Sequence, residues 1–171
     1  LVEEIKIKKN SATPFSRKPT DAKPKQIEDI KPQDNPKHKL LDTELNRVLG
    51  GGVVQGSLVL IGGDPGIGKS TLMLQLAVKE KMKVLYVSGE ESEQQIKMRA
   101  ERIKITNEDC YILTETNLES ILNHTASVEP QFIVIDSIQT LHSNHIESSP
   151  GSVSQVRECT SQLLRFAKEN N

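Results

Sequence analysis

The sequence predicts an α/β fold, in which a mostly parallel sheet has helices on both faces. Three observations predict it. Short apolar runs typical of buried strands recur between residues 57 and 136, segments with helical spacing lie between them, and a glycine-rich loop joins the first run to the next helix. Parallel strands require such crossover helices, and ligands of these sheets bind at the carboxyl ends of the strands.

Residues 1–39 differ in composition from the rest of the 171-residue chain. They hold five of the eight prolines and ten Lys or Arg against six Asp or Glu, a net charge of +4. The remaining residues have 12 Lys or Arg against 17 Asp or Glu, a net charge of −5. Because the apolar residues of 1–39 show no period, we predict a linker or tail that is mostly disordered or extended. Contact between this basic segment and nucleic acid is the alternative.

The first regular elements follow from residue 40. KLLDTELNRVL has apolar residues at helical spacing, Asp42 or Thr43 can cap the helix, and GGG at 50–52 ends it. Its apolar positions are Leu41, Leu45, Val48 and Leu49. SLVLIGG, residues 57–63, is a continuous apolar run that predicts a strand buried on both faces. A helix is expected from Lys69 onward.

Three further strands and three helices complete the prediction. KVLYVSG (83–89), CYIL (110–113) and QFIVID (131–136) are expected to be strands. Ser92 with Gln95, and Ser152 with Gln155, match capping boxes, while Asn117 can cap the helix between them. The apolar or small residues at helical spacing are Ile96, Ala100 and Ile103, then Leu118, Ile121 and Leu122, and last Val153, Val156, Thr160, Leu163 and Ala167.

The composition excludes several classes of site. Aromatic residues make up 3% of the chain and Trp is absent, which argues against a site of stacked bases or sugars. No apolar run approaches the length of a membrane helix, and LVEEIKIKKN lacks the apolar core of a signal peptide. We therefore expect a cytoplasmic protein without a membrane partner. Cys110 and Cys159 are expected to be buried reduced thiols rather than a disulfide or metal ligands, and His142 and His145 to be solvated rather than to bind a metal.

The loop GGDPGIGKST, residues 62–71, is the strongest functional motif. It matches G-x-x-x-x-G-K-[ST] at every fixed position and lies between a predicted strand and a predicted helix. Glycines allow backbone N–H groups to converge on phosphate oxygens, and the helix adds the positive end of its dipole. Lys69 is placed to reach the β- and γ-phosphates, and Ser70 to ligate Mg²⁺. The expected nucleotide-binding residues are Gly63, Asp64, Pro65, Gly66, Ile67, Gly68, Lys69, Ser70 and Thr71.

Acidic residues follow two of the predicted strands. Asp136 ends the run FIVID and is a candidate for a second Mg²⁺ contact, commonly made through water. Glu90 and Glu91 follow the strand at 83–89, and one of their carboxylates could polarise the water that attacks the γ-phosphate. The alternative is that both acids only stabilise the first turn of the next helix.

Four stretches occur in a fixed order: LNRVLGGGVVQGSLVLIGGDPGIGKSTLMLQLA, VLYVSGEES, VIDSIQTLHS and SSPGSVSQVRECT. Together they resemble the ATPase core of the RadA (Sms) family of bacterial DNA repair proteins, over about residues 40–171. The resemblance implies a RecA-like fold and ATP hydrolysis coupled to DNA, with Mg²⁺ as cofactor. It also implies action on single-stranded or branched DNA in recombination and repair, a homo-hexameric ring, and a recombinase of the RecA type as partner.

The resemblance implies roles for individual residues. Lys69, Glu90 and Asp136 are the candidate catalytic residues, and Glu91 is the alternative to Glu90 as the base. Ser70 and Asp136 are the candidate metal contacts. Further candidates near the γ-phosphate follow Asp136 in the sequence, and they are Ser137 and Gln139.

The sequence also departs from the pattern of the family. The family's N-terminal zinc finger of four cysteines, its Lys-Asn-Arg-Phe-Gly motif and its domain resembling the Lon protease have no counterpart here, and the first residue is Leu. We therefore expect an internal fragment: a linker at 1–39, then the first part of the ATPase domain at 40–171. An incomplete sheet and an acidic core without a DNA track predict that this fragment alone binds ATP weakly and hydrolyses little.

Two other functions compete with a DNA-dependent ATPase. A RecA-like ATP-dependent assembly or signalling module without nucleic acid is favoured by the net charge of −5 on the core. A small-molecule kinase is disfavoured, because a carboxylate follows the strand at 83–89 and no arginine-rich lid is visible.

Overall fold

The computed structural model describes residues 24–29 and 36–170. The chain divides into two units, Leu1–Asp34 and Asn35–Asn171. In the first unit, the described residues include a short 3₁₀ helix, η1, at Ile27–Asp29. Most of the predicted linker lies outside the described residues. Strand β1, Lys37–His38, falls just inside the range assigned to the linker and pairs antiparallel with β2, Val53–Val54.

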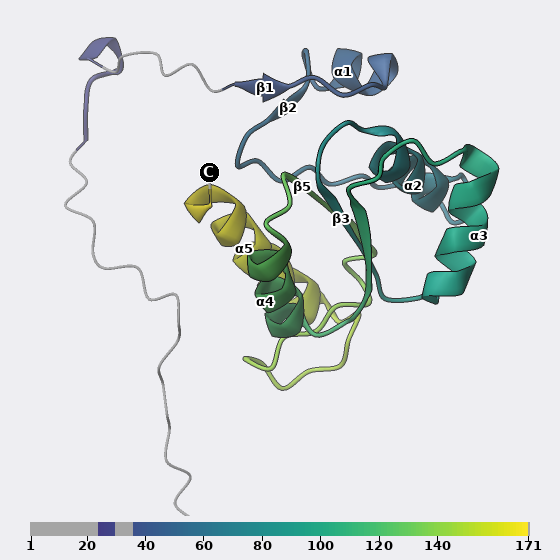
Figure 1. The fold of residues 1–171 in the computed structure, drawn as a ribbon. Coiled ribbons are helices and arrows are strands. Elements are labelled where there is room, and N and C mark those ends of the chain that lie inside the picture. Colours follow the sequence, from purple (N-terminus) through teal and green to yellow (C-terminus); the bar gives the residue numbers. More distant parts are fainter. Residues whose placement is uncertain (1–23, 30–35, 171) are drawn as a thin grey trace, which may run out of the picture. The chain divides into compact units, whose positions relative to one another are not determined.

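The second unit alternates helices with strands, as Figure 1 shows. Its elements after β1 are α1 (Thr43–Val48), β2, α2 (Lys69–Lys79), β3 (Val84–Ser88), α3 (Glu93–Ile103), β4 (Cys110–Thr114), α4 (Leu118–Val128), β5 (Phe132–Asp136) and α5 (Val153–Glu169). Strands β4, β3 and β5 form a parallel sheet in that order. The predicted α/β fold with a parallel sheet is confirmed, as are the three strands expected at 83–89, 110–113 and 131–136.

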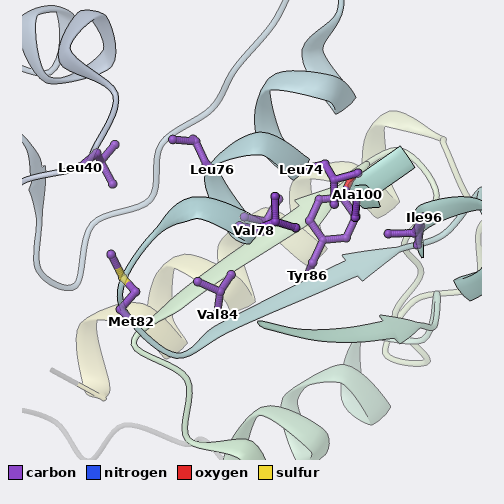
Figure 2. Packing of buried hydrophobic residues seen from close by; sticks show 11 residues of the cluster. Leu40, Leu74, Leu76, Val78, Met82, Val84, Tyr86, Ile96 and Ala100 are labelled. Carbon is purple, nitrogen blue, oxygen red and sulfur yellow. The ribbon is translucent and has the colours of Figure 1, made fainter. Parts of the chain in front are cut away.

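Strand β3 divides the core into two layers because its side chains alternate between the faces of the sheet. Val84 and Tyr86 lie in a cluster with residues of α2 and α3 (Figure 2). Leu85 and Val87 lie in a second cluster with residues of α4 and α5. All five residues of β3 are buried. The helices therefore cover both faces of the sheet, as the sequence predicts.

The prediction of a strand at residues 57–63 is wrong. In the described part of the chain, this apolar run lies outside both sheets, and Leu60 is 77% exposed. An extended segment becomes a strand only when its N–H and C=O groups pair with a neighbour. No ladder partner is present for 57–63 in the described sheets, so its apolar composition alone does not produce a strand.

The helix starts follow the predicted caps. Asp42, Ser92, Asn117 and Ser152 each accept a hydrogen bond from a backbone N–H of the first turn, at α1, α3, α4 and α5. The capping box at α3 is complete, with Gln95 returning to the backbone of Ser92.

Two expected helix faces need correction. Leu41 and Val48, predicted on the apolar side of the first helix, are 55% and 65% exposed. On α5, Val153 is exposed, whereas Gln155 is buried beside Cys159 and Leu163. Gln155 therefore does not complete a capping box, because its side chain bonds to the loop before the helix instead. None of the described helices is both long and apolar enough to cross a membrane.

The two cysteines are free thiols. Cys159 is fully buried, as predicted, but Cys110 is only half-buried because β4 lies at the edge of the described sheet. Burial raises the pKa of the Cys110 thiol to about 11. Burial, helped by the charges of Glu119 and Glu158, raises the pKa of Cys159 to about 11.

Both thiols should react slowly with Ellman's reagent while the chain is folded, because the thiolate is the nucleophile. With pKa values of about 11, roughly one thiol in a thousand is ionised at pH 8. The measurement is chromophore release at pH 8 with and without urea, with Cys110→Ser assigning the two thiols. One equivalent released rapidly without urea would contradict this protection.

Candidate nucleotide site

The phosphate-binding motif forms an exposed loop that leads directly into α2. Residues 62–68 are exposed, and the helix begins at Lys69 with Gly68 as its N-cap. Gly66 and Gly68 have φ angles of 81° and 97°, a left-handed conformation that side chains with a Cβ rarely adopt. No side chain caps this helix start, so the positive end of the helix dipole faces outward. A bound anion would supply the missing acceptor.

Lys69 closes the loop on itself. Its Nζ donates to the backbone oxygens of Gly63 and Asp64, each at 2.7 Å. These contacts hold the ammonium group over the exposed loop. Thr71, the last residue of the motif, is exposed on the first turn of α2.

Ser70 and Asp136 are brought together from positions 66 residues apart. The Ser70 hydroxyl donates to Asp136 Oδ1 at 3.1 Å. The other carboxylate oxygen, Oδ2, accepts a hydrogen bond from the Tyr86 hydroxyl at 2.7 Å. Asp136 is the last residue of β5 and pairs in register with Ser88, the last residue of β3. The loop, the helix start and the ends of two strands therefore meet at one edge of the sheet.

The two glutamates after β3 have different surroundings. The carboxylate of Glu91 forms an ion pair with the Arg99 guanidinium, and its backbone N–H donates to Ser88 Oγ at 3.1 Å. Glu90 is exposed, and its Oε1 accepts a hydrogen bond from Ser137 Oγ at 3.4 Å. Glu91 is thus neutralised locally, whereas Glu90 remains accessible at the edge where the strands end.

The loop after β5 packs against the end of β3. The Asp136–Ser137 peptide bond is cis. Thr140 Oγ1 donates to the Ser137 carbonyl at 2.8 Å, and the Thr140 side chain fills the space beside Gly89. Gln139 is exposed. This close approach requires glycine at position 89, because a Cβ there would overlap the Thr140 side chain.

A polar hollow of about 280 Å³ lies next to this edge. It is lined by Ser88, Gly89, Glu90, Glu91, Ser92, Thr114, Glu115 and Thr116. Hydrogen bonds from the backbone of Asn117 and neighbouring groups hold the pKa of Glu115 below its usual value. The hollow is therefore bordered by carboxylates rather than by apolar side chains.

The residues present fit a magnesium nucleotide. The uncapped start of α2 and the left-handed glycines suit phosphate, and Lys69 provides a cation. The Ser70 hydroxyl and the Asp136 carboxylate are hard oxygen donors, which Mg²⁺ prefers, and they already lie 3.1 Å apart.

The comparison with protein families agrees with this geometry. A family model described as "AAA domain" matches residues 29–171. The chain belongs to the AAA domain family.

Three DNA repair proteins illustrate the similarity of this AAA domain to known proteins. The chain is 48% identical over 174 residues to DNA repair protein RadA of Listeria monocytogenes and 51% identical over 175 residues to that of Bacillus subtilis. It is 47% identical over 176 residues to that of Streptococcus pyogenes serotype M1. These alignments cover 98–100% of this chain but 38% of each relative, so the chain spans little more than a third of their length. The resemblance indicated by the four sequence motifs is confirmed.

Sequence reasoning missed two side chains of this AAA domain. Tyr86 contacts Asp136, and Arg99 neutralises Glu91. The phenol had a recognisable signal, since a Tyr within an aliphatic buried strand requires a partner for its hydroxyl. Burial, and then the hydrogen bond to Asp136, raise the pKa of Tyr86 above its usual range. Arg99 gave no such signal, because it is one of several basic residues on α3.

The two histidines considered in the sequence, His142 and His145, have different surroundings. His145 is exposed, and its Nε2 lies 3.6 Å from Glu119 Oε1. The expectation that His142 is solvated is wrong, since its Nδ1 is buried and has no hydrogen-bond partner. Within the described residues, no group of three or more His, Cys, Asp or Glu side chains is arranged to hold a metal ion.

Gly89→Ala should lower the free energy of unfolding by about 1–3 kcal/mol. The reason is that an added Cβ would lie 2.0 Å from Thr140 Oγ1 and 2.6 Å from Thr140 Cβ. Urea unfolding measures the loss. Gly62→Ala is the matched control, because a Cβ there meets no atom within 4 Å.

Thr140→Gly should recover part of this loss in the double variant with Gly89→Ala, since it removes both clashing atoms. If Gly89→Ala and Gly62→Ala lowered the free energy of unfolding equally, the loop would not constrain Gly89.

Proposed function

We propose that this chain is the ATP-binding and ATP-hydrolysing part of a DNA-dependent ATPase of the RadA type, with Mg²⁺ as cofactor. The observation that carries the proposal is the contact between Ser70 and Asp136 at the uncapped start of α2. It joins the hydroxyl of Ser70, in the phosphate-binding motif, to the carboxylate of Asp136 at the end of β5. A hydroxyl and a carboxylate at this separation suit a metal bound to phosphate.

The chain's own residues would perform the binding steps. Backbone N–H groups of the loop and of the first turn of α2 would hold the phosphates, because no side chain occupies them. Lys69 would exchange its two loop carbonyls for phosphate oxygens, which are stronger acceptors for an ammonium group. When bound, Mg²⁺ would neutralise negative charge on the β- and γ-phosphates. Ser70 and Asp136 would hold it.

Glu90 is the better candidate for the base that activates the attacking water. Its carboxylate is exposed and has a weak contact with Ser137, so it can accept a proton from a water at this edge. Glu91 is engaged by Arg99 and would need to break an ion pair first. Ser137, next to Asp136, would then be placed to sense the γ-phosphate and to report its state to Glu90.

The larger assembly is also part of the proposal. The matched relatives are named DNA repair proteins, which supports a role in DNA repair. Action on single-stranded or branched DNA is proposed from the family resemblance. A homo-hexamer in the cytoplasm, with a recombinase of the RecA type as partner, follows from the same family resemblance. DNA contacts and residues that act across subunits are expected outside the site described above.

A second candidate is an ATP-dependent assembly module without nucleic acid. The net charge of −5 on residues 40–171 favours it, because DNA binding depends on Lys and Arg contacts to phosphates. Stimulation of ATP hydrolysis by DNA separates the two functions.

The natural protein that carries this sequence should release phosphate from ATP, and single-stranded DNA should increase the rate. Lys69→Ala should abolish turnover with or without DNA, because it removes the cation on the phosphates. Phosphate release with and without DNA and EDTA is the measurement. Normal turnover of Lys69→Ala would refute the phosphate site, whereas turnover unchanged by DNA would favour the assembly module.

Glu90→Gln should keep nucleotide affinity and slow hydrolysis by roughly a hundredfold or more, as expected for loss of a general base. Glu91→Gln is the matched control and should slow hydrolysis less, since its main loss is the ion pair with Arg99. Single-turnover rates and the affinity for a fluorescent ATP analogue separate chemistry from binding. The reverse ranking of the two variants would assign the base to Glu91.

A further inference from the structure

Tyr86 is a phenol in a strand, VLYVS, that is otherwise aliphatic apart from its last residue. The side chain is 0% exposed and packs in the cluster that includes Leu74 of α2 and Ala100 of α3 (Figure 2). Its hydroxyl nevertheless reaches a carboxylate, with 2.7 Å between the phenol oxygen and Asp136 Oδ2. The ring is therefore fixed by packing, and its single donor is directed at a residue of the nucleotide site.

The two oxygens of Asp136 have different donors. Oδ1 accepts a hydrogen bond from the Ser70 hydroxyl. This hydroxyl can rotate about the Cα–Cβ bond of Ser70, and it is itself a candidate metal ligand. Oδ2 accepts from Tyr86, whose ring is locked between α2, α3 and the sheet. If Ser70 turns toward a metal, Tyr86 is the donor that still holds the carboxylate.

Such a donor affects what the carboxylate can do. Asp136 is the last residue of β5 and is only half-buried, so its side chain would otherwise sample several rotamers. A hydrogen bond from a neutral donor to a carboxylate is charge-assisted and is stronger than one between neutral groups. With Oδ2 held, Oδ1 keeps a constant direction toward Ser70 and the start of α2.

We infer that Tyr86 is a positioning residue for Asp136, whose hydroxyl holds one carboxylate oxygen so that the other faces the magnesium nucleotide. The inference rests on the proposed function. It differs from a role in packing alone, because packing depends on the ring, whereas positioning depends on the hydroxyl. Tyr86→Phe separates the two, since it keeps the ring and removes the donor.

The experiment measures binding of a fluorescent ATP analogue to the natural protein that carries this sequence as Mg²⁺ is titrated, and again in EDTA. Tyr86→Phe should raise the Mg²⁺ concentration at half-saturation about tenfold, the effect of losing one charge-assisted hydrogen bond. Affinity for the analogue in EDTA should not change. Tyr111→Phe is the matched control, because Tyr111 is 44% exposed on β4, at the far side of β3 from β5. It should leave both values unchanged.

A double variant tests whether Tyr86 acts through Asp136. In an Asp136→Asn background, Tyr86→Phe should cause no further change in the Mg²⁺ midpoint. A second tenfold shift there, or a midpoint within about twofold of the parent in the single variant, would overturn the inference while leaving nucleotide binding by the parent intact. Loss of the thermal unfolding transition in Tyr86→Phe alone would assign the hydroxyl to folding and would also overturn it. If the parent protein bound no nucleotide, the proposed function itself would fail.

Discussion

The parallel pairing of β3 with a strand on each side is the constraint on which the rest of the second unit depends. Because β4 and β5 run in the same direction as β3, all three strands end at the same level, with Ser88 beside both Thr114 and Asp136. The same pairing buries both faces of β3, so the two layers of helices pack on a common support. The backbone hydrogen bonds of the sheet therefore group the polar residues at the strand ends independently of their side-chain contacts.

The three candidate acids of the site, Asp136, Glu90 and Glu91, have different hydrogen-bond or ion-pair partners. Asp136 is held by two neutral hydroxyl donors, Glu91 by a guanidinium, and Glu90 by one weak contact. Charges of one sign repel one another unless donors or cations offset them. Under the proposed function, this arrangement separates the acid that would hold a metal from the acid that would accept a proton.

Much of the fold and the site follows from local pattern, and the failures have a common physical cause. The motif at 62–71, the strand ending in Asp136 and the caps at α3 and α4 depend on neighbouring residues, so the sequence predicts them well. The apolar run at 57–63 depends on a distant pairing partner, which composition cannot supply. Gln155 gives a similar lesson, because its amide is satisfied by loop oxygens and an N–H that only the folded chain brings near. The ion pair between Arg99 and Glu91, which adds support to the proposed choice of Glu90, likewise became visible only in the folded chain.

The contact between Tyr86 and Asp136 has an optical consequence. The chain has no Trp and only two Tyr, so its near-ultraviolet absorption above the range of Phe comes from Tyr86 and Tyr111 alone. One of these phenols is exposed, and the other lies against the carboxylate of the candidate metal site. A change in the charge near Asp136 therefore alters one of the two tyrosine chromophores in these 171 residues, and this segment carries an intrinsic spectroscopic probe within its own candidate site.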